Sequence, residues 1–266
     1  MPETETFRMP LEAAEAFEAR FVPVLFTPWA ERLVEAAGIR EGQRVLDVAC
    51  GTGAVARIAA DRVGESGTVV GLDANESMLT VARRLRDDVE WRQADASELP
   101  LPDDAFDVVT CQAGLMFFPD PEGALREMAR VAKPGGTVGV QVWDRREDQP
   151  AYGPFNAIVE RHAGPDAASL VNAYFVHGDR SKLETMLRSA GLGIDEFRTD
   201  STTMRFANAD ELVAIEIRTT PLGARLSEDV IRAIVEDVRE ALKGFTNAEG
   251  SLDVPMRGHI VIAHPA

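Results

Sequence analysis

Short apolar runs of β character alternate with segments of helical periodicity in the first half of the chain. The apolar runs predict strands at residues 44–49, 68–73, 89–94, 106–111 and 137–143. The helical patterns cover residues 27–37, opened by Thr27 and Pro28, then residues 53–62, 76–86 and 120–132. Strands and helices that alternate in this way are typical of βαβ units, so the pattern predicts an α/β fold around a parallel sheet.

The pattern changes after residue 143, where a charged stretch precedes helices near residues 154–162 and 167–173 with no strand between them. Ser181 and Glu184 have the spacing of a capping box, which predicts a helix that ends at Gly191. Further elements are predicted in the order strand 194–205, helix 210–218, helix 228–243 and strand 259–263. We therefore expect one domain, with a core at about 36–143, 178–205 and 256–266 and a helical cap at about 1–35, 144–177 and 206–245.

The composition and net charge argue against some classes of function. The 266 residues include 28 Lys and Arg against 44 Asp and Glu, and the net charge of −16 argues against a nucleic-acid partner, because phosphate binding needs clustered basic side chains. No apolar run is long enough to span a membrane and the N-terminus is acidic, so we expect a cytoplasmic protein. Cys50 and Cys111 make no disulfide framework, and both are expected to be reduced. No cluster of metal ligands is predicted.

The most informative segment is residues 45–53, Val-Leu-Asp-Val-Ala-Cys-Gly-Thr-Gly, in which an apolar strand runs directly into Gly-x-Gly and a helix. Glycines let the backbone approach a ligand, and the helix start aims free N–H groups at it. Asp73 lies twenty residues beyond Gly53, at the end of the second strand, where a carboxylate can accept from ribose hydroxyls. Together these features predict a nucleoside site, and Gly51, Gly53 and Ala56 leave both NAD and S-adenosylmethionine open.

Later segments of the chain distinguish between NAD and S-adenosylmethionine. Residues 93–96, Gln-Ala-Asp-Ala, close the third strand, Leu-Pro and Phe-Asp follow at residues 99–100 and 106–107, and Arg-Val-Ala-Lys-Pro-Gly-Gly at 130–136 precedes the fifth strand. This series resembles the class I S-adenosylmethionine-dependent methyltransferases, in particular the type 11 group that includes ubiquinone and menaquinone biosynthesis enzymes. The resemblance covers roughly residues 40–143. It implies a Rossmann-like, seven-stranded methyltransferase sheet, mostly parallel with the last strand antiparallel, beneath a helical cap.

The resemblance also implies roles for individual residues. Asp47 would orient the methionine end of S-adenosylmethionine, Asp73 would hold the ribose, and Asp95 would accept from the adenine amine, with the Ala96 N–H on a ring nitrogen. Gln112 would lie beside the methionyl group. The complete cofactor set that it implies is Asp47, Ala49, Gly51, Gly53, Asp73, Ala74, Met78, Asp95, Ala96 and Gln112.

The acceptor side carries no motif. His177, between two apolar residues and the cap of a predicted helix, is the first candidate for a catalytic base, ahead of His162, Tyr152 and Tyr174. One of Phe117 and Phe118 is expected to wall an acceptor pocket, and Trp29 to pack in the core. The expected activity is in-line methyl transfer to a small-molecule acceptor, with oxygen favoured over carbon as the nucleophile.

Two alternatives to methyl transfer stay open at this point. One is an NAD-type oxidoreductase, although neither tyrosine has a lysine four residues later, and the other is a non-catalytic module that binds a nucleoside. A homodimer is also left open.

Overall fold

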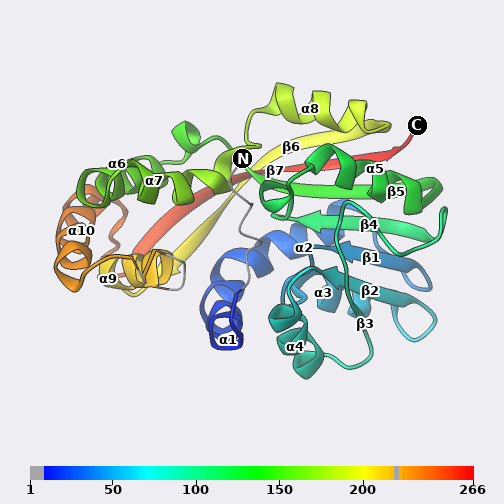
Figure 1. Cartoon of the computed structure of the whole chain (residues 1–266), viewed down its shortest axis with the longest axis horizontal. Helices are drawn as coiled ribbons and strands as arrows, with labels where there is room; N and C mark the ends of the chain where they lie inside the picture. Colours follow the sequence, from blue (N-terminus) through cyan, green and yellow to red (C-terminus); the bar gives the residue numbers. More distant parts are fainter. Residues whose placement is uncertain (1–8, 219–221, 224) are drawn as a thin grey trace.

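The computed structural model describes residues 9–218, 222–223 and 225–266. The expected cap segments 1–35 and 206–245 therefore fall partly outside the described residues, at 1–8, 219–221 and 224. Seven strands form one sheet in the order β3-β2-β1-β4-β5-β7-β6 (Figure 1). Their bounds are β1 Arg44–Val48, β2 Thr68–Asp73, β3 Glu90–Gln93, β4 Phe106–Gln112, β5 Ala132–Trp143, β6 Leu192–Phe206 and β7 Leu252–Pro265. Strands β1 to β5 are parallel, and β7 is antiparallel to both β5 and β6, so the predicted sheet is confirmed.

The main helices are α1 Leu11–Arg20, α2 Thr27–Ala36, α3 Ala54–Val63, α4 Glu76–Leu85, α5 Pro121–Val131, α6 Tyr152–Ala163, α7 Pro165–Asn172, α8 Arg180–Ser189, α9 Ala209–Val213 and α10 Glu228–Ala241. Short turns of helix join some of them: η1 Val22–Phe26, η2 Leu115–Phe117, η3 Arg146–Asp148, η4 Ala173–Phe175, η5 Ala214–Arg218 and η6 Lys243–Phe245. Asp120 caps α5, the helix predicted from residue 120, since its carboxylate accepts from the Gly123 N–H at 2.8 Å.

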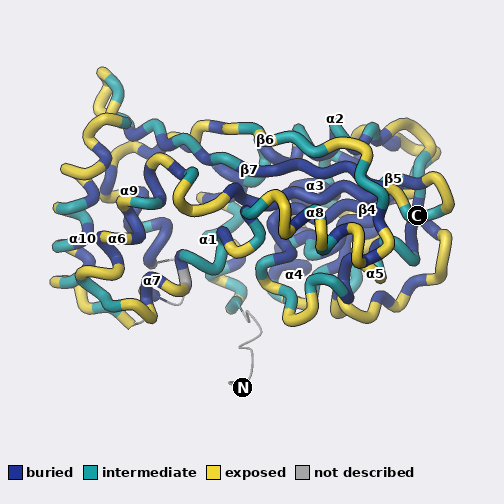
Figure 2. The backbone as a smooth tube through the Cα atoms, turned by 90° about the horizontal axis from the view of Figure 1, so that it is seen from above, coloured by how far each residue is buried: buried dark blue, intermediate teal, exposed yellow. Residues whose placement is uncertain are grey.

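The strands of the sheet bury side chains on both faces. Val45 of β1 joins a cluster with helices α2 and α3, whereas the next residue, Leu46, joins a second cluster with α5 and α8. Val108 and Val109 of β4 divide in the same way, because successive side chains of a strand point to opposite faces. Figure 2 shows the resulting buried layer between exposed helices.

The β6–β7 ribbon extends beyond the rest of the sheet. Trp143, the last residue of β5, pairs with Gly258, so residues 252–257 of β7 and their partners in β6 lie past the carboxyl end of β5. Helices α6, α7, α9 and α10 gather around this extension, away from the parallel strands (Figure 1). Apolar side chains of the extension, Met204, Phe206, Val254 and Met256, share a buried cluster with those helices. The ribbon therefore carries the cap.

The N-terminal segment differs from the expectation. Residues 11–36 are helical almost throughout, because α1 leads through η1 into α2, so Thr27 lies inside a helical path and does not act as an N-cap. Helix α1 packs on α4. Helix α2, expected in the cap, buries Trp29 and Leu33 against the sheet and belongs to the core layer.

Three other boundaries were wrong. Asp179, rather than Ser181, caps α8 by accepting from the Lys182 N–H at 3.1 Å, and Glu184 pairs with Arg180 instead of closing a capping box. Strand β7 starts at Leu252 instead of 259, since its outer half is held by pairing with β6. Strand β5 begins at Ala132 instead of 137, so it includes the Pro-Gly-Gly segment that was expected to precede it.

Candidate functional site

The loop after β1 turns sharply at the carboxyl edge of the sheet. Ala49, Gly51 and Gly53 all have positive φ, at 54°, 56° and 88°, and α3 starts at Ala54. Positive φ is uncommon for a residue with a side chain, so Ala49 is held in a strained backbone region. Helix α3 thus begins directly after the carboxyl end of β1, where the N–H groups of a helix start can bind a ligand.

Asp73 holds this loop in place. At the end of β2 its Oδ2 accepts from the Gly51 N–H and its Oδ1 from the Asn75 N–H, both at 2.8 Å. Burial raises the pKa of the Asp73 carboxyl group above its ordinary value, and the two backbone N–H groups oppose that change. Each carboxylate oxygen keeps a second lone pair, which can accept from a ligand hydroxyl.

The two glycines of the motif serve different purposes. A Cβ added at Gly51 would meet no heavy atom within 4 Å, so its surface is open. A Cβ at Gly53 would lie 2.3 Å from the Cη2 atom of Trp91, and one at Gly71 would lie 2.4 Å from the same ring. A side chain at position 53 would therefore collide with Trp91 of β3. This packing constraint was not part of the prediction, which explained Gly53 by close approach to a cofactor.

Asp47 is enclosed by protein. Its Oδ2 accepts from the Ala56 N–H at 3.1 Å and its Oδ1 from the Thr110 hydroxyl at 3.0 Å, and the residue is 1% exposed. Burial raises its pKa to about 7, although both hydrogen bonds favour the charged form. Asp47 therefore ties β1 to α3 and β4, and this bracing was not its expected role beside the methionine end.

The end of β3 presents a different kind of carboxylate. Asp95 is exposed, and its Oδ1 accepts from both the N–H and the hydroxyl of Ser97, at 2.8 and 2.7 Å, which lowers its pKa. Ala96 beside it is buried. Ala74 is exposed and its carbonyl accepts from Gln93, while Met78 packs against α1.

The carboxyl end of β4 meets the N-terminal helices. The Gln112 Nε2 donates to the Phe26 carbonyl at 2.8 Å, so this side chain is bonded to η1. Ala113 follows with a φ of 49°, and η2 begins at Leu115. Phe117 is 44% exposed, whereas Phe118 packs against the core cluster, which divides the aromatic pair between the surface and the core.

The structure brings His177 to this end of β4. The half-buried His177 ring is hydrogen-bonded to the backbone of Leu115, and burial lowers its pKa despite that bond. A neutral imidazole can accept a proton, so the group has the protonation state that a base needs. His162, the lesser candidate, instead pairs with Asp237 at 2.6 Å in the cap.

A buried network that the sequence did not predict holds the His177 loop. The His259 Nε2 lies 2.9 Å from the Gly178 carbonyl and 3.2 Å from Asp144, and its Nδ1 lies 2.9 Å from the Thr199 hydroxyl. A Cβ at Gly178 would lie 2.3 Å from the Arg145 nitrogen, so the loop packs on the backbone after β5. In the sequence, His259 is a single histidine at the start of an apolar strand. That position alone does not distinguish a buried histidine from an exposed one at a strand end.

The sequence analysis also did not predict a second buried polar group. Glu216 of η5 accepts a hydrogen bond from the Tyr152 hydroxyl inside the cap, and both residues are 3% exposed. Tyr174 lies near this carboxylate, and its ring makes an edge contact with Phe117. A glutamate within a helical pattern gave no sign of burial.

The two cysteines and Trp29 offer no reactive group. Burial raises the pKa of Cys111 to about 12 and that of Cys50 well above its ordinary value, so both free thiols stay protonated. Trp29 packs edge-on to Trp143 in the core, as expected. Within the described part of the chain, no three His, Cys, Asp or Glu side chains are grouped to hold a metal ion, and no helix is long and apolar enough to cross a membrane.

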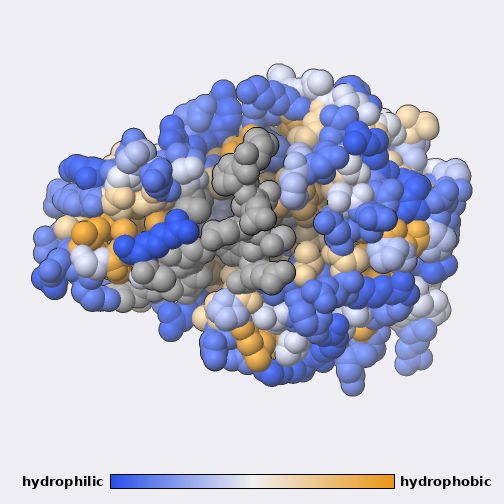
Figure 3. Space-filling view, viewed as in Figure 1, coloured by the Kyte–Doolittle hydropathy of each residue, from blue (hydrophilic) through white to orange (hydrophobic). Residues whose placement is uncertain are grey.

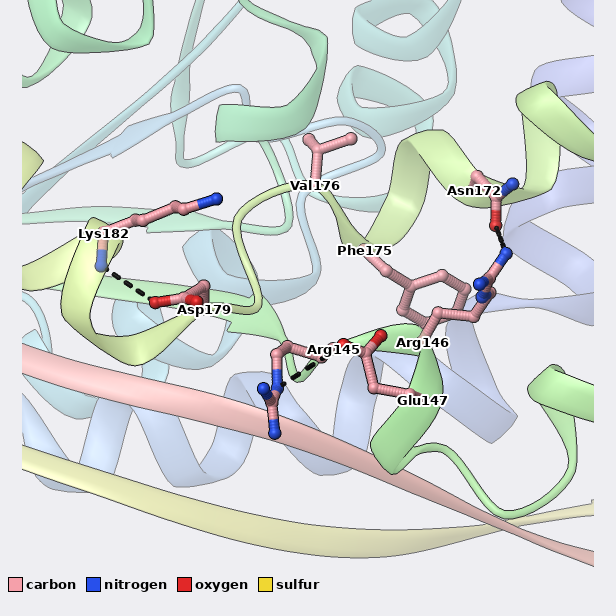
Figure 4. Close-up of a pocket in the computed structure, with 8 residues that line it drawn as sticks. All are labelled: Arg145, Arg146, Glu147, Asn172, Phe175, Val176, Asp179 and Lys182. Carbon is pink, nitrogen blue, oxygen red and sulfur yellow. Dashed lines mark hydrogen bonds and ion pairs between the residues drawn. The ribbon is translucent and has the colours of Figure 1, made fainter.

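A cavity of about 280 Å³ is lined in part by Val176 and Asp179, which flank His177 and Gly178 in the chain (Figure 4). Charged side chains dominate its lining: Arg145, Arg146, Glu147, Asp179 and Lys182, with Asn172, Phe175 and Val176. Most of these charges are already engaged with protein, Arg145 with Asp148 for example. Because its lining is mainly charged, this cavity does not suit an apolar ligand. The face of the molecule drawn in Figure 3 is also largely hydrophilic outside the grey atoms.

Comparison with known proteins identifies the family. Residues 46–140 match a family model described as a methyltransferase domain. The ubiquinone/menaquinone biosynthesis C-methyltransferase UbiE of Cronobacter sakazakii is 38% identical over 179 residues, which cover 61% of this chain and 71% of that protein. The chain belongs to the class I S-adenosylmethionine-dependent methyltransferases.

Solved structures of low identity share the fold. The YcgJ protein of Bacillus subtilis matches with a TM-score of 0.60 at 22% identity, covering 88% of this chain and 96% of that one. Phosphoethanolamine N-methyltransferase 2 of Haemonchus contortus, solved with S-adenosylhomocysteine, matches with a TM-score of 0.56 at 18% identity, covering 90% of this chain and 53% of that one.

Family membership settles the choice between the two nucleoside cofactors. This methyltransferase uses S-adenosylmethionine, and it is an enzyme rather than a passive nucleoside-binding module. The open surface at Gly51 and the free lone pairs of Asp73 fit such a cofactor at the carboxyl edge of β1 and β2.

Proposed function

We propose that this methyltransferase transfers the methyl group of S-adenosylmethionine to a carbon atom of a small, partly apolar acceptor that carries an acidic hydroxyl group. The similarity to a named C-methyltransferase over 179 residues carries this proposal. It reverses the order expected from the sequence, in which oxygen came before carbon. The exposed Phe117 and the neighbouring Tyr174 ring support an aromatic acceptor, because flat apolar ligands pack on aromatic side chains.

We further propose how the chain holds the cofactor. Asp73 accepts from the ribose hydroxyls while it keeps Gly51 in place, and Gly51 gives the methionyl part close access to the backbone. Asp95, kept ionised by Ser97, accepts from the adenine amine, with the Ala96 N–H beside it. Asp47 acts through the loop that it braces. The cofactor supplies an electrophilic methyl group on a sulfonium.

The transfer needs alignment more than chemical activation. The bond between sulfur and the methyl carbon breaks as a new carbon–carbon bond forms, and one proton leaves the methylated carbon. His177, neutral and next to the end of β4, is placed to take that proton. Holding two reactants in line is worth effective molarities of roughly 10⁵ M or more, so fixed geometry supplies much of the rate.

The test is to identify the methylated atom. The enzyme is incubated with S-adenosylmethionine carrying a ¹³C methyl group and with reduced 2-prenyl-1,4-naphthalenediol as the probe, and the product is examined by NMR. A methyl signal bonded to a ring carbon supports the proposal. A methoxy signal, or no product from a protein that binds S-adenosylhomocysteine normally, would contradict it.

A further inference from the structure

A buried histidine of β7 joins the sheet to residues 176–179, the His177 loop. The His259 side chain is almost wholly buried, and its Nε2 atom lies 2.9 Å from the Gly178 carbonyl oxygen and 3.2 Å from Oδ1 of Asp144. Both of these oxygens are acceptors, so Nε2 carries the ring hydrogen and donates it. The His259 side chain therefore bonds the backbone of the loop directly.

Two neighbours fix the orientation of the His259 ring. Asp144 is buried, and its Oδ2 accepts from the Arg257 Nε at 2.9 Å while its Oδ1 accepts from the Arg145 N–H at 2.8 Å. The Thr199 hydroxyl lies 2.9 Å from Nδ1 of His259 and can donate to it. A carboxylate on one side and a hydroxyl on the other thus select a single tautomer of the ring.

The strands around His259 do not need its side chain to stay together. The backbone of His259 is already paired with Val142 of β5 and with Thr199 of β6. The His177 loop, in contrast, lies outside all seven strands, between η4 and α8. What the His259 side chain adds to the backbone pairing is a bond between the sheet and this loop.

The loop in turn holds His177 at the end of β4. The His177 ring is hydrogen-bonded to the Leu115 backbone, and a Cβ at Gly178 would lie 2.3 Å from the Arg145 nitrogen, so the loop packs directly on the backbone after β5. A shift of the Gly178 carbonyl would therefore move the neighbouring His177 ring. Displacing a reacting group by about 1 Å can lower a rate by about 10²-fold.

We propose that His259, oriented by Asp144, is a positioning residue for methyl transfer. Its Nε2–H holds the Gly178 carbonyl and thereby keeps the His177 imidazole beside Leu115, where that imidazole takes the proton from the methylated carbon. No bond to His259 forms or breaks in the reaction, and the proton passes only to His177. This inference rests on the role of His177 proposed above.

The experiment removes the His259 hydrogen bond and then restores it. His259→Phe keeps a flat ring without a donor for the Gly178 carbonyl, whereas His259→Gln offers an amide N–H in place of Nε2–H. His264→Phe is the matched control, because His264 lies further along the same strand and pairs with the exposed Asp195 at 2.8 Å. Asp144→Asn is a second, milder variant that removes the charge facing the His259 ring.

The first readout is the titration of His177, followed by NMR of the whole chain with ¹⁵N-labelled histidine and bound S-adenosylhomocysteine. The chain has four histidines, so single substitutions assign their ring signals. Burial, the larger of two effects, holds the pKa of His177 below its ordinary value. His259→Phe should raise that pKa toward the ordinary value because the loop is released, and His259→Gln and His264→Phe should leave it unchanged.

The second readout is turnover of the reduced 2-prenyl-1,4-naphthalenediol probe. His259→Phe should lower kcat by about 10- to 100-fold with unchanged affinity for S-adenosylhomocysteine, and His259→Gln should stay within about threefold of the wild type. In a His177→Ala background, His259→Phe should have little further effect, because it acts through His177. Asp144→Asn should change both readouts in the same direction but less, which tests the inference even where His259→Phe folds poorly.

The possible failures can be told apart. A folded His259→Phe variant with the wild-type His177 titration and turnover would overturn the inference, and so would an equal loss of turnover in the His177→Ala background. If the wild type binds S-adenosylhomocysteine but methylates no probe, the acceptor class proposed above is wrong. The His177 titration of the same variants then still decides whether His259 holds the loop.

Discussion

Replacing Asp73 with Asn tests the cofactor site most directly, because the change keeps the shape of the side chain and removes its charge. In the structure the carboxylate accepts from the Gly51 and Asn75 N–H groups, each at 2.8 Å. An amide offers only one acceptor oxygen, so one of these N–H groups faces an NH₂ group instead. The variant therefore loses one loop hydrogen bond and the charged acceptor for the ribose.

The expected magnitudes follow from these two losses. A hydrogen bond to a charged group contributes about 1.5 to 3 kcal/mol, so affinity for S-adenosylhomocysteine should fall by about 10- to 150-fold. An N–H group left without an acceptor costs about 1 to 2 kcal/mol, which should lower the melting temperature by about 2 to 6 °C in a chain of this size. Calorimetric titration measures the first effect and thermal unfolding the second.

A matched control separates the site from the fold. Asp120 also accepts from a backbone N–H at a helix start, on α5, so Asp120→Asn should lower stability by a similar amount and leave the affinity unchanged. If Asp73→Asn binds S-adenosylhomocysteine as tightly as the wild type, Asp73 does not hold the ribose and the proposed orientation of the cofactor is wrong.

Three further predictions use other parts of the site. Gly51→Ala should keep a folded protein with at least about tenfold weaker cofactor binding, whereas Gly53→Ala should cost about 2 to 5 kcal/mol in unfolding free energy through its clash with Trp91; equal stabilities in urea would contradict this difference. His177→Ala should lower turnover by about 10²-fold or more and remove an ionisation from the pH–rate profile, and an unaltered profile would exclude a base there. The pKa of Glu216 is raised from 4.5 to about 7, so the folded state binds the extra proton and this group lowers stability as pH rises through that window, by about 3 kcal/mol. Glu216→Gln should flatten that decline between pH 5 and pH 8 in denaturant titrations, and an unchanged slope would show that Glu216 ionises normally.

The sequence predicted the strands and helices around the Gly-x-Gly segment well because their signals are local. Strand β2 begins and ends where the apolar run does, and the Gly-x-Gly segment leads into a helix as expected. The position of Asp73 at the end of a strand follows from the same run. Such features depend on neighbours in the chain, and periodicity and glycine placement report on those neighbours.

Features set by distant partners could not be predicted in the same way. The outer half of β7 is a strand because residues 252–257 pair with β6; buried and partly exposed positions alternate along it, but the sequence analysis placed no strand there. Gly53 fits beneath Trp91, which lies 38 positions later, so the sequence pattern gave the glycine but only part of the reason for it. Glu216 and His259 are buried by elements far along the chain, while their own segments resemble an exposed helix and a strand start.

The parallel-strand part of the chain and the cap differ in how their segments come together, and this difference explains why only the first could be predicted. The proposed cofactor contacts come from one continuous stretch, residues 47–112, whose strands are neighbours in the sheet. The cap draws on three separated segments, represented by Tyr152, Tyr174 and Glu216, which meet where the β6–β7 ribbon extends past the end of β5. A substitution in the cap is thus expected to leave the loop held by Asp73 as it is. His259, at the point of β7 where ribbon and sheet join, contacts the Gly178 carbonyl and thereby fixes the His177 loop relative to both halves.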